Sequence, residues 1–156
     1  MVQDIGSGLK CFLIVLTTGM LAACQPKNNK NMSSEVLALR LKPGADLKEE
    51  LEKLATEKNI EAGWMVSCAG SLTDYTIRFA NQPEGQTGSG HFEIISLSGT
   101  ISKNGSHLHI GISDSTGKTI GGHLLRGCKV YTTAEIVIGY SDRFVFTREK
   151  DGTTPW

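Results

Sequence analysis

The segment S-H-L-H-I-G-I-S-D constrains the fold more than any other part of the chain, because apolar and polar residues alternate along it. In an extended strand, Leu108, Ile110 and Ile112 point to one face of the sheet. His107 and His109 then point to the opposite face. The segment therefore predicts a strand that is buried on one face and presents two imidazoles on the other.

A third histidine, His123, follows a glycine-rich stretch that begins at Gly117. His107 and His109 are two residues apart on one strand face, which places their imidazoles within reach of one ion. Three neutral imidazoles with room for a water are the ligand set of an open zinc site, so the three histidines are candidate metal ligands. The alternative is polar side chains that are solvated on a strand face or satisfied within the core, and these need no metal.

The length and composition fit one globular domain. The chain has 156 residues, which the usual size range assigns to one domain with a sizeable core. Its 16 basic and 16 acidic residues balance, so the net charge gives no indication of binding to nucleic acid or to an anionic surface. Its 18 glycines favour a strand-rich fold with many tight turns.

The first 24 residues differ from the rest of the chain. Residues 11–23 form an apolar run that is short for a membrane span but typical of a signal-peptide core. The run ends in Leu-Ala-Ala-Cys, which resembles the bacterial lipobox, so Cys24 is the candidate lipidation site. We therefore expect a lipoprotein-type signal peptide at 1–24 and a lipoprotein anchored in a membrane of the cell envelope, facing the periplasm or the exterior. Because residues 1–10 are barely basic, a plain hydrophobic extension is the alternative.

Residues 25–34 lack apolar periodicity and predict a flexible tether, so the folded domain is expected at 35–156. Its two cysteines, Cys68 and Cys128, lie in apolar runs, which predicts buried free thiols. In an oxidising compartment, a disulfide between them is the alternative.

The domain is predicted to contain one main helix and about seven strands. Asp46 and Glu49 have the spacing of a capping box at the start of a helix that ends near Asn59. The buried stripe of this helix is predicted to consist of Leu47, Leu51, Leu54 and Ala55. Strands are predicted at 36–41, 62–69, 75–79, 92–100, 107–113, 130–138 and 144–147, with a loop at 81–90. An α+β fold with a largely antiparallel sheet follows.

Five segments of the domain form a specific set of motifs: A-G-S-L at 69–72, G-H-F-E-I-I-S-L-S-G at 90–99, H-L-H-I-G-I-S-D at 107–114, G-K-T-I-G-G-H-L at 117–124 and G-C-K-V-Y-T-T-A-E-I-V-I at 127–138. Together they resemble the PPC (plants and prokaryotes conserved) domain. The resemblance extends from about Val36 to the C-terminus. It implies a homotrimer of α+β subunits in which His107, His109 and His123 hold a metal ion, with zinc (Zn2+) as the expected cofactor.

The resemblance leaves three functions open. The expected one is a lipid-anchored trimeric module that binds zinc or a small ligand through the three histidines, without catalysis. The alternative is a zinc-dependent lyase or hydrolase acting on a small carboxylated substrate, because the fold also resembles acetolactate decarboxylase, a zinc enzyme with an H-x-H pair and a third histidine. DNA binding, by analogy with plant relatives that carry AT-hooks, is disfavoured because the chain has no Arg-Gly-Arg-Pro run and no excess of basic charge.

An enzyme would need a proton carrier and a group that binds the substrate. Glu93 is the candidate catalytic carboxylate, or it orients a ligand histidine through a hydrogen bond. Glu135 is expected to be buried in a structural ion pair or hydrogen bond instead. Arg126 is the candidate for binding an anionic substrate, with an ordinary surface or interface ion pair as the alternative. His91 is expected at the edge of a loop rather than in the site.

Overall fold

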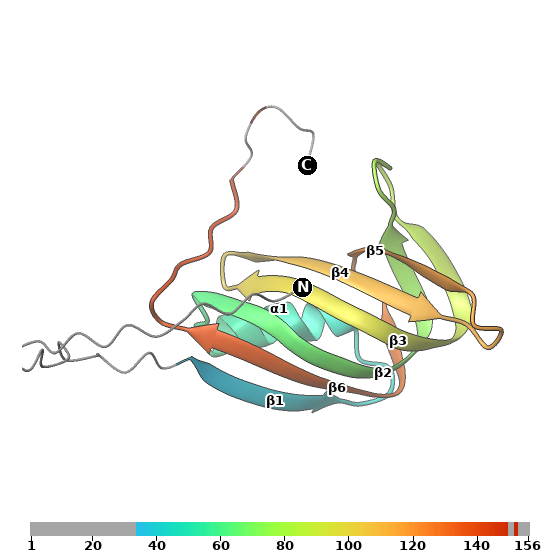
Figure 1. The fold of residues 1–156 in the computed structure, drawn as a ribbon, viewed down its shortest axis with the longest axis horizontal. Helices are drawn as coiled ribbons and strands as arrows, with labels where there is room; N and C mark the ends of the chain where they lie inside the picture. Colours follow the sequence, from blue (N-terminus) through green and yellow to red (C-terminus); the bar gives the residue numbers. More distant parts are fainter. Residues whose placement is uncertain (1–33, 150–151, 153–156) are drawn as a thin grey trace, which may run out of the picture. The chain divides into compact units, whose positions relative to one another are not determined.

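A computed structural model describes residues 34–149 and 152 of the chain. The elements, in chain order, are β1 (Glu35–Leu41), α1 (Leu47–Glu57), β2 (Ala62–Arg78), β3 (Gln86–Ser102), β4 (Gly105–Ser113), β5 (Thr119–Leu124) and β6 (Lys129–Ser141). The strands form one six-stranded sheet in the order β1-β6-β2-β3-β4-β5, and every strand pair is antiparallel (Figure 1). The predicted α+β class, with one main helix and a largely antiparallel sheet, is confirmed within these residues.

The sheet curls at its β5 end, so that β5 also pairs with β2. β5 pairs with β4 along its length, and it also pairs with the end of β2, where Ile77 lies opposite Leu124 and Arg78 lies opposite His123. Register shifts in β2 beside Leu72 help the strand to bend, because a bulge increases local twist. Strands β2, β3, β4 and β5 therefore close into a ring, and three of these strands meet near His123.

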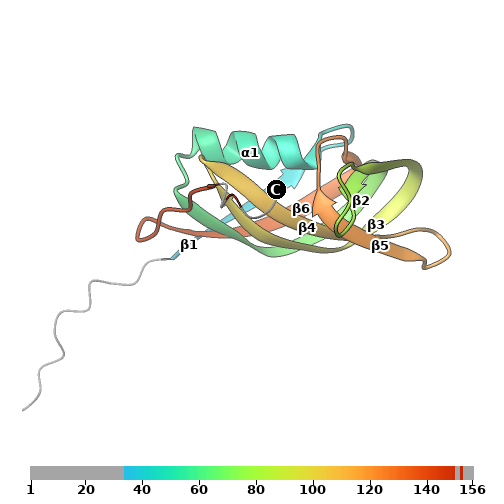
Figure 2. The same ribbon diagram turned by 90° about the horizontal axis from the view of Figure 1, so that it is seen from above.

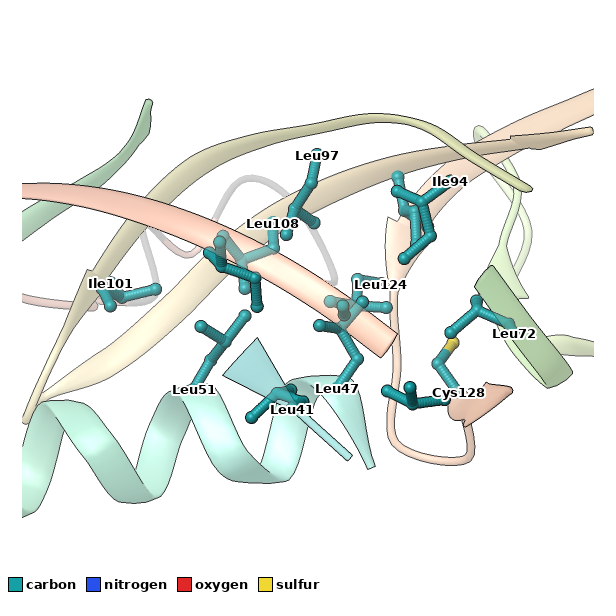
Figure 3. Close-up of a cluster of buried hydrophobic side chains, with 14 of the residues drawn as sticks. Leu41, Leu47, Leu51, Leu72, Ile94, Leu97, Ile101, Leu108, Leu124 and Cys128 are labelled. Atoms are coloured by element: carbon teal, nitrogen blue, oxygen red, sulfur yellow. The ribbon is translucent and has the colours of Figure 1, made fainter. Parts of the chain in front are cut away.

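The helix covers one face of the sheet, as Figure 2 shows. Asp46 caps it as predicted, because its Oδ1 accepts a hydrogen bond of 3.1 Å from the backbone N–H of Glu49. Leu47 and Leu51 are fully buried and point from the helix toward Leu108 and Leu124 of the sheet (Figure 3). Burying a leucine side chain stabilises a fold by about 2 kcal/mol before the entropy of ordering it is subtracted.

Residues 62–69 and 75–79 were predicted as two strands, but 62–69 and 75–78 belong to the single strand β2, which ends at Arg78. Gly70, which indicated a break, lies inside that strand. A Cβ at Gly70 would lie 2.2 Å from the backbone oxygen of Thr133, so glycine is needed there for close approach of β6 rather than for a turn. The prediction failed because an isolated glycine gives the same signal in both situations.

The loop prediction at 81–90 is wrong for its second half, which is the start of β3. Gly88 lies opposite Tyr75 in the β2–β3 pair, and the Ser89 hydroxyl donates a hydrogen bond of 2.6 Å to Asp74. Pairing with the far end of β2 therefore orders residues that have no strand pattern of their own.

The strand β5 was missed because Gly121 and Gly122 indicate a turn. In the structure these glycines let β5 fit between its two neighbours. A Cβ at Gly121 would lie 2.8 Å from the Ile110 backbone oxygen, and one at Gly122 would lie 2.5 Å from the Arg78 backbone oxygen. The glycine pair is thus what allows the strand that carries His123 to pack against both β4 and β2.

The predicted strand at 144–147 is absent, because these residues follow β6 as an extended segment outside the sheet. Phe146 holds this C-terminal segment (residues 142–149) in place. Its N–H donates to the Glu61 carbonyl at 2.9 Å, and its carbonyl accepts hydrogen bonds from Ser102 and Asn104 at 3.0 and 3.1 Å. Hydrogen bonds at one residue do not form a β-ladder, although they fix the path of the C-terminal segment.

Both cysteines of the domain are free thiols, as expected. Cys128 is buried, whereas Cys68 is half-buried, and burial raises the pKa of each thiol to about 11. The predicted signal peptide at 1–24 and the tether at 25–34 lie outside the described residues, apart from the last residue of the tether. Among the described residues, no helix has the length and hydropathy needed to span a bilayer.

Candidate metal centre

The three histidines come from two neighbouring strands of the ring. His107 and His109 belong to β4, where the buried side chains of Leu108 and Ile110 alternate with them. His123 belongs to β5 and lies directly opposite His109 in the antiparallel pair. The predicted alternation of β4 is confirmed, and strand register brings the third histidine to the other two.

The imidazoles form a compact cluster. The ring centroids of His107 and His109 are 5.0 Å apart, those of His107 and His123 are 5.3 Å apart, and those of His109 and His123 are 4.6 Å apart. One ring nitrogen from each residue lies within 4.8 Å of the other two. Two nitrogens on one tetrahedral zinc are about 3.4 Å apart, so small side-chain rotations would bring the three rings onto one ion.

The environment of the cluster lowers the pKa of two of its imidazoles, those of His107 and His123. Partial burial lowers the pKa of His107, and the nearby charges of Arg148, His109, Arg78 and Lys48 lower it further. The pKa of His123 is lowered by the same burial effect and then by Arg78 and the other two histidines. Because a metal binds the neutral form of imidazole, both shifts favour a ligating histidine at neutral pH.

A pocket with a cavity volume of about 530 Å³ lies beside His107 and His123. Lys48, Arg78 and Arg148 line it, and the sequence analysis singled out none of them. One sequence signal was available for Lys48, since a lysine in the first turn of a helix is opposed by the helix dipole. No pattern marks Arg78 or Arg148, because their positions follow from the curl of the sheet and from the path of the C-terminal segment.

Glu93 is not brought to the histidines. It is exposed on β3 and lies opposite Ser113, which is four residues along β4 from His109, or about 13 Å. Glu135 was expected to be buried, but it is exposed and forms an ion pair of 2.5 Å with Arg40. The structure therefore gives Glu135 the structural ion pair that was expected, and it gives Glu93 no contact with the cluster.

Arg126 is outside the pocket lining, and its guanidinium forms an ion pair of 2.9 Å with Glu52. This contact is the alternative that the sequence left open for Arg126. His91 stacks on Tyr131, with ring centroids 4.3 Å apart, and does not join the other histidines. Within the described part of the chain, the three-histidine group is the one cluster of histidine, cysteine or acidic side chains with metal-ligand geometry.

An α+β subunit with an antiparallel sheet, one main helix and a cluster of His107, His109 and His123 agrees with what the PPC resemblance implies for a single subunit. Comparison with known families agrees with it. The chain matches the Plants and Prokaryotes Conserved (PCC) domain, called PPC here, over residues 29–142. The protein belongs to this family, so the resemblance inferred from the sequence is confirmed.

The chain is also similar to curated relatives and to solved structures. The bifunctional protein GlmU of Synechococcus sp. (strain JA-3-3Ab) is 44% identical over 136 residues, which cover 87% of this chain and 22% of that protein. The chain therefore spans about a fifth of the length of that relative. A hypothetical protein from Salmonella enterica is 40% identical, with a TM-score of 0.74 over 76% of this chain and 86% of that one.

A structure described as a metal-containing protein comes from Archaeoglobus fulgidus. It is 28% identical to this chain, with a TM-score of 0.64, and the match covers 75% of this chain and 86% of that one. Two observations therefore suggest possible metal binding by this protein. A fold relative contains a metal, and this chain has a cluster of three histidines.

Proposed function

We propose that this protein is a metal-binding module of the PPC family, in which His107, His109 and His123 hold one zinc ion. The observation that carries the proposal is the mutual approach of their ring nitrogens to within 4.8 Å. The lowered pKa values of His107 and His123 support it, because they keep the rings in the ligating form. Three nitrogen ligands leave a fourth coordination position for a small ligand.

We favour ligand binding without catalysis. When bound, zinc would supply Lewis acidity to a carbonyl or similar group of the ligand. The side chains of this chain would bind and orient that ligand. Neither Glu93 nor Glu135 lines the pocket beside the histidines, and no carboxylate does among the described residues. A carboxylate acting as general acid or base would have to lie within hydrogen-bond reach of the reacting group, and no carboxylate among the described residues lines the pocket.

The pocket of about 530 Å³ next to the cluster favours a second candidate, the zinc-dependent lyase or hydrolase. Its size falls within the range of small-molecule sites. Its cationic lining suits the carboxylated substrate expected from the sequence, with Lys48, Arg78 and Arg148 in the role first given to Arg126. Without a carboxylate in the lining, proton transfer in such an enzyme would fall to a histidine or to the substrate itself.

Elemental analysis of the full chain tests the proposal. The protein is purified without chelator and without a histidine-rich tag, and zinc is measured before and after incubation with zinc. We expect about one zinc per chain, and none in the triple variant H107A/H109A/H123A. X-ray absorption at the zinc edge then distinguishes three nitrogens plus one exchangeable light atom from a site closed by a fourth protein ligand. Absence of zinc from the incubated wild-type protein would refute the proposal.

We also propose that the protein is a homotrimer, as the family resemblance implies. Large apolar side chains that a single chain leaves in water support self-association. Ile95 on β3 is 59% exposed in the single chain. Val66 on β2 is 57% exposed, and Tyr131 on β6 is 42% exposed. Contact with further copies would cover them.

We propose further that Cys24 is lipidated and anchors the protein in a membrane of the cell envelope, with the domain facing the periplasm or the exterior. The support is the apolar run at 11–23 followed by Leu-Ala-Ala-Cys. An envelope location and a balanced charge make nucleic acid an unsuitable partner, because phosphate contacts dominate such binding.

A further inference from the structure

Strands β4 and β5 separate at the histidine cluster. Their antiparallel pairing ends where His109 lies opposite His123, and residues 105–108 of β4 are not paired with any described residue of β5. Beyond this point β5 pairs with the end of β2 instead. The β4–β5 pairing therefore sets the distance between His109 and His123, but it does not set the position of His107 relative to His123.

Glu52 of α1 connects the two strands where they separate. Its Oε1 accepts a hydrogen bond of 2.9 Å from the hydroxyl of Ser106, the residue that precedes His107. Its Oε2 accepts a hydrogen bond of 2.9 Å from the guanidinium of Arg126, which lies two residues beyond the end of β5. One carboxylate therefore links the part of β4 that lacks a β5 partner to the chain segment that follows β5.

The surroundings of Glu52 favour its ionised form. Burial raises the pKa of Glu52, but the hydrogen bonds from Arg126 and Ser106 and the nearby positive charge outweigh this effect, so the pKa lies below its ordinary value. Lys48, one helical turn earlier, adds an ion pair of 3.8 Å. The Glu52 side chain is 26% exposed, so water screens these contacts only in part. Its two hydrogen bonds are consequently charge-assisted ones.

The helix that carries Glu52 is fixed to the rest of the domain. Leu51 is fully buried in the core. Asp46, which caps the helix, also accepts a hydrogen bond of 2.6 Å from the backbone N–H of Gly127. Because Gly127 follows Arg126 directly, α1 holds the segment after β5 at two consecutive residues. Glu52 therefore extends from a rigid element, which is a more precise support for a site than a loop.

We propose that Glu52 is a positioning residue of the candidate metal centre, which holds His107 near His123 by tying β4 and the segment after β5 to α1. Its role in metal binding rests on the proposed function. The His107–His123 pair is the widest of the three, with 5.3 Å between ring centroids, so it is the pair that most needs support. Removing groups that orient metal ligands typically weakens metal affinity about tenfold to hundredfold.

The test uses two measurements on the full chain and its variants E52A and E52Q. The first is the nuclear Overhauser effect (NOE) between imidazole rings in the zinc-free protein, which reports ring separation without a metal. The second is zinc affinity, measured by competition with a chromophoric chelator. E57Q is the matched control, because Glu57 forms its ion pair with Lys53 inside the same helix.

We expect E52A to lose most of the NOE between His107 and His123 and to retain the NOE between His109 and His123, which strand register holds together. Zinc affinity should fall at least about tenfold in E52A. The fall should be smaller in E52Q, because glutamine still offers an oxygen to Ser106 although it carries no charge. E57Q should match the wild-type protein within about twofold.

The variant S106A separates positioning from a general loss of stability. It should weaken zinc affinity by itself and have no further effect in E52A, because both substitutions remove the same contact. Urea denaturation of each zinc-free variant measures stability independently. If E52A does not fold, the same NOE and affinity comparisons are made with E52Q and S106A.

An unchanged NOE between His107 and His123 in E52A would overturn the inference. Equal weakening of both ring pairs would also overturn it, as would additive effects of S106A and E52A on zinc affinity. The proposed function is tested separately by the wild-type protein. If that protein takes up no zinc, the metal site is refuted, whereas the NOE of the zinc-free protein still decides whether Glu52 positions His107.

Discussion

His109 and His123 are directly opposite each other in the antiparallel β4–β5 pair, and their ring centroids lie 4.6 Å apart. The register of two strands therefore sets this distance, and no flexible loop intervenes. His107 is two residues from His109 on the same face, so all three rings project from the sheet without belonging to the core. The cluster can consequently be altered without removing buried side chains.

The first prediction concerns H109A. We expect this variant to lose stoichiometric zinc, because two remaining imidazoles cannot complete an open three-nitrogen site. The unfolding midpoint of the metal-free protein should be nearly unchanged, since exposed side chains contribute little to stability. Elemental analysis and chemical denaturation give the two readouts. H91A is the matched control because His91 stacks on Tyr131 outside the cluster, and full zinc content in H109A would end the three-histidine proposal.

The second prediction concerns pH. His107 and His123 have pKa values below the ordinary imidazole value of 6.5 in the folded protein. The unfolded chain therefore binds more protons than the folded one in this range, so their contribution to stability is fully present above pH 6.5. It is lost as the pH falls through the folded-state pKa values. The free energy of unfolding of the zinc-free protein should decrease from about pH 7.5 to about pH 5, and the decrease should be shallower in H107Q/H123Q. Parallel curves for the two proteins would contradict this.

How far the sequence predicted this site depended on whether a pattern was local. The alternation in β4 and the capping of α1 by Asp46 are local, and both were predicted correctly. The ring that joins β5 to β2 is not local. Its evidence in the sequence is the pair Gly121-Gly122, which reads equally well as a turn, so the strand carrying His123 was missed although His123 itself was singled out.

The residues that line the pocket were even harder to predict from local sequence patterns than strand β5. Arg126 was chosen as the anion-binding residue because it follows the third histidine closely in the sequence. In the structure the Arg126 guanidinium forms an ion pair with Glu52 instead. Arg78 and Arg148 are far from the histidines in sequence and reach them through strand pairing and through the anchoring of Phe146. Such proximity depends on tertiary contacts that no periodicity encodes.

The third prediction tests the proposed trimer. Sedimentation equilibrium of the wild-type protein should give three times the mass of its single chain, which is 16.8 kDa when all 156 residues are present. I95E should shift the protein to smaller species, because a carboxylate placed in an apolar interface loses its hydration. V145E is the control, since Val145 is exposed in the C-terminal segment rather than on the sheet. A wild-type protein that sediments as a monomer at micromolar concentration would refute the trimer.

The fourth prediction tests the anchor at Cys24. C24S should leave the chain unprocessed or soluble, because the hydroxyl of serine does not replace the thiol that lipidation needs. Membrane fractionation and intact-mass spectrometry of the cell-derived protein give the two readouts. C11S is the matched control, since Cys11 lies in the apolar run that would be removed. Normal mature mass and membrane association in C24S would show that the lipobox assignment is wrong.

The last prediction concerns two glycines, Gly99 on β3, which lies opposite Leu108, and Gly111 within the histidine strand β4. Gly99 has a φ of +123°, and a Cβ there would lie 1.9 Å from the backbone oxygen of His107. G99A therefore combines backbone strain with a clash against a strand that cannot move alone, and we expect it to destabilise the fold by about 3 kcal/mol or more. At Gly111 the nearest atom is the Ser96 hydroxyl at 2.8 Å, which can rotate away. G111A should cost less than about 1 kcal/mol and retain zinc, as measured by urea denaturation and metal analysis. Equal destabilisation by the two substitutions would contradict the close packing of Gly99 against the backbone oxygen of His107.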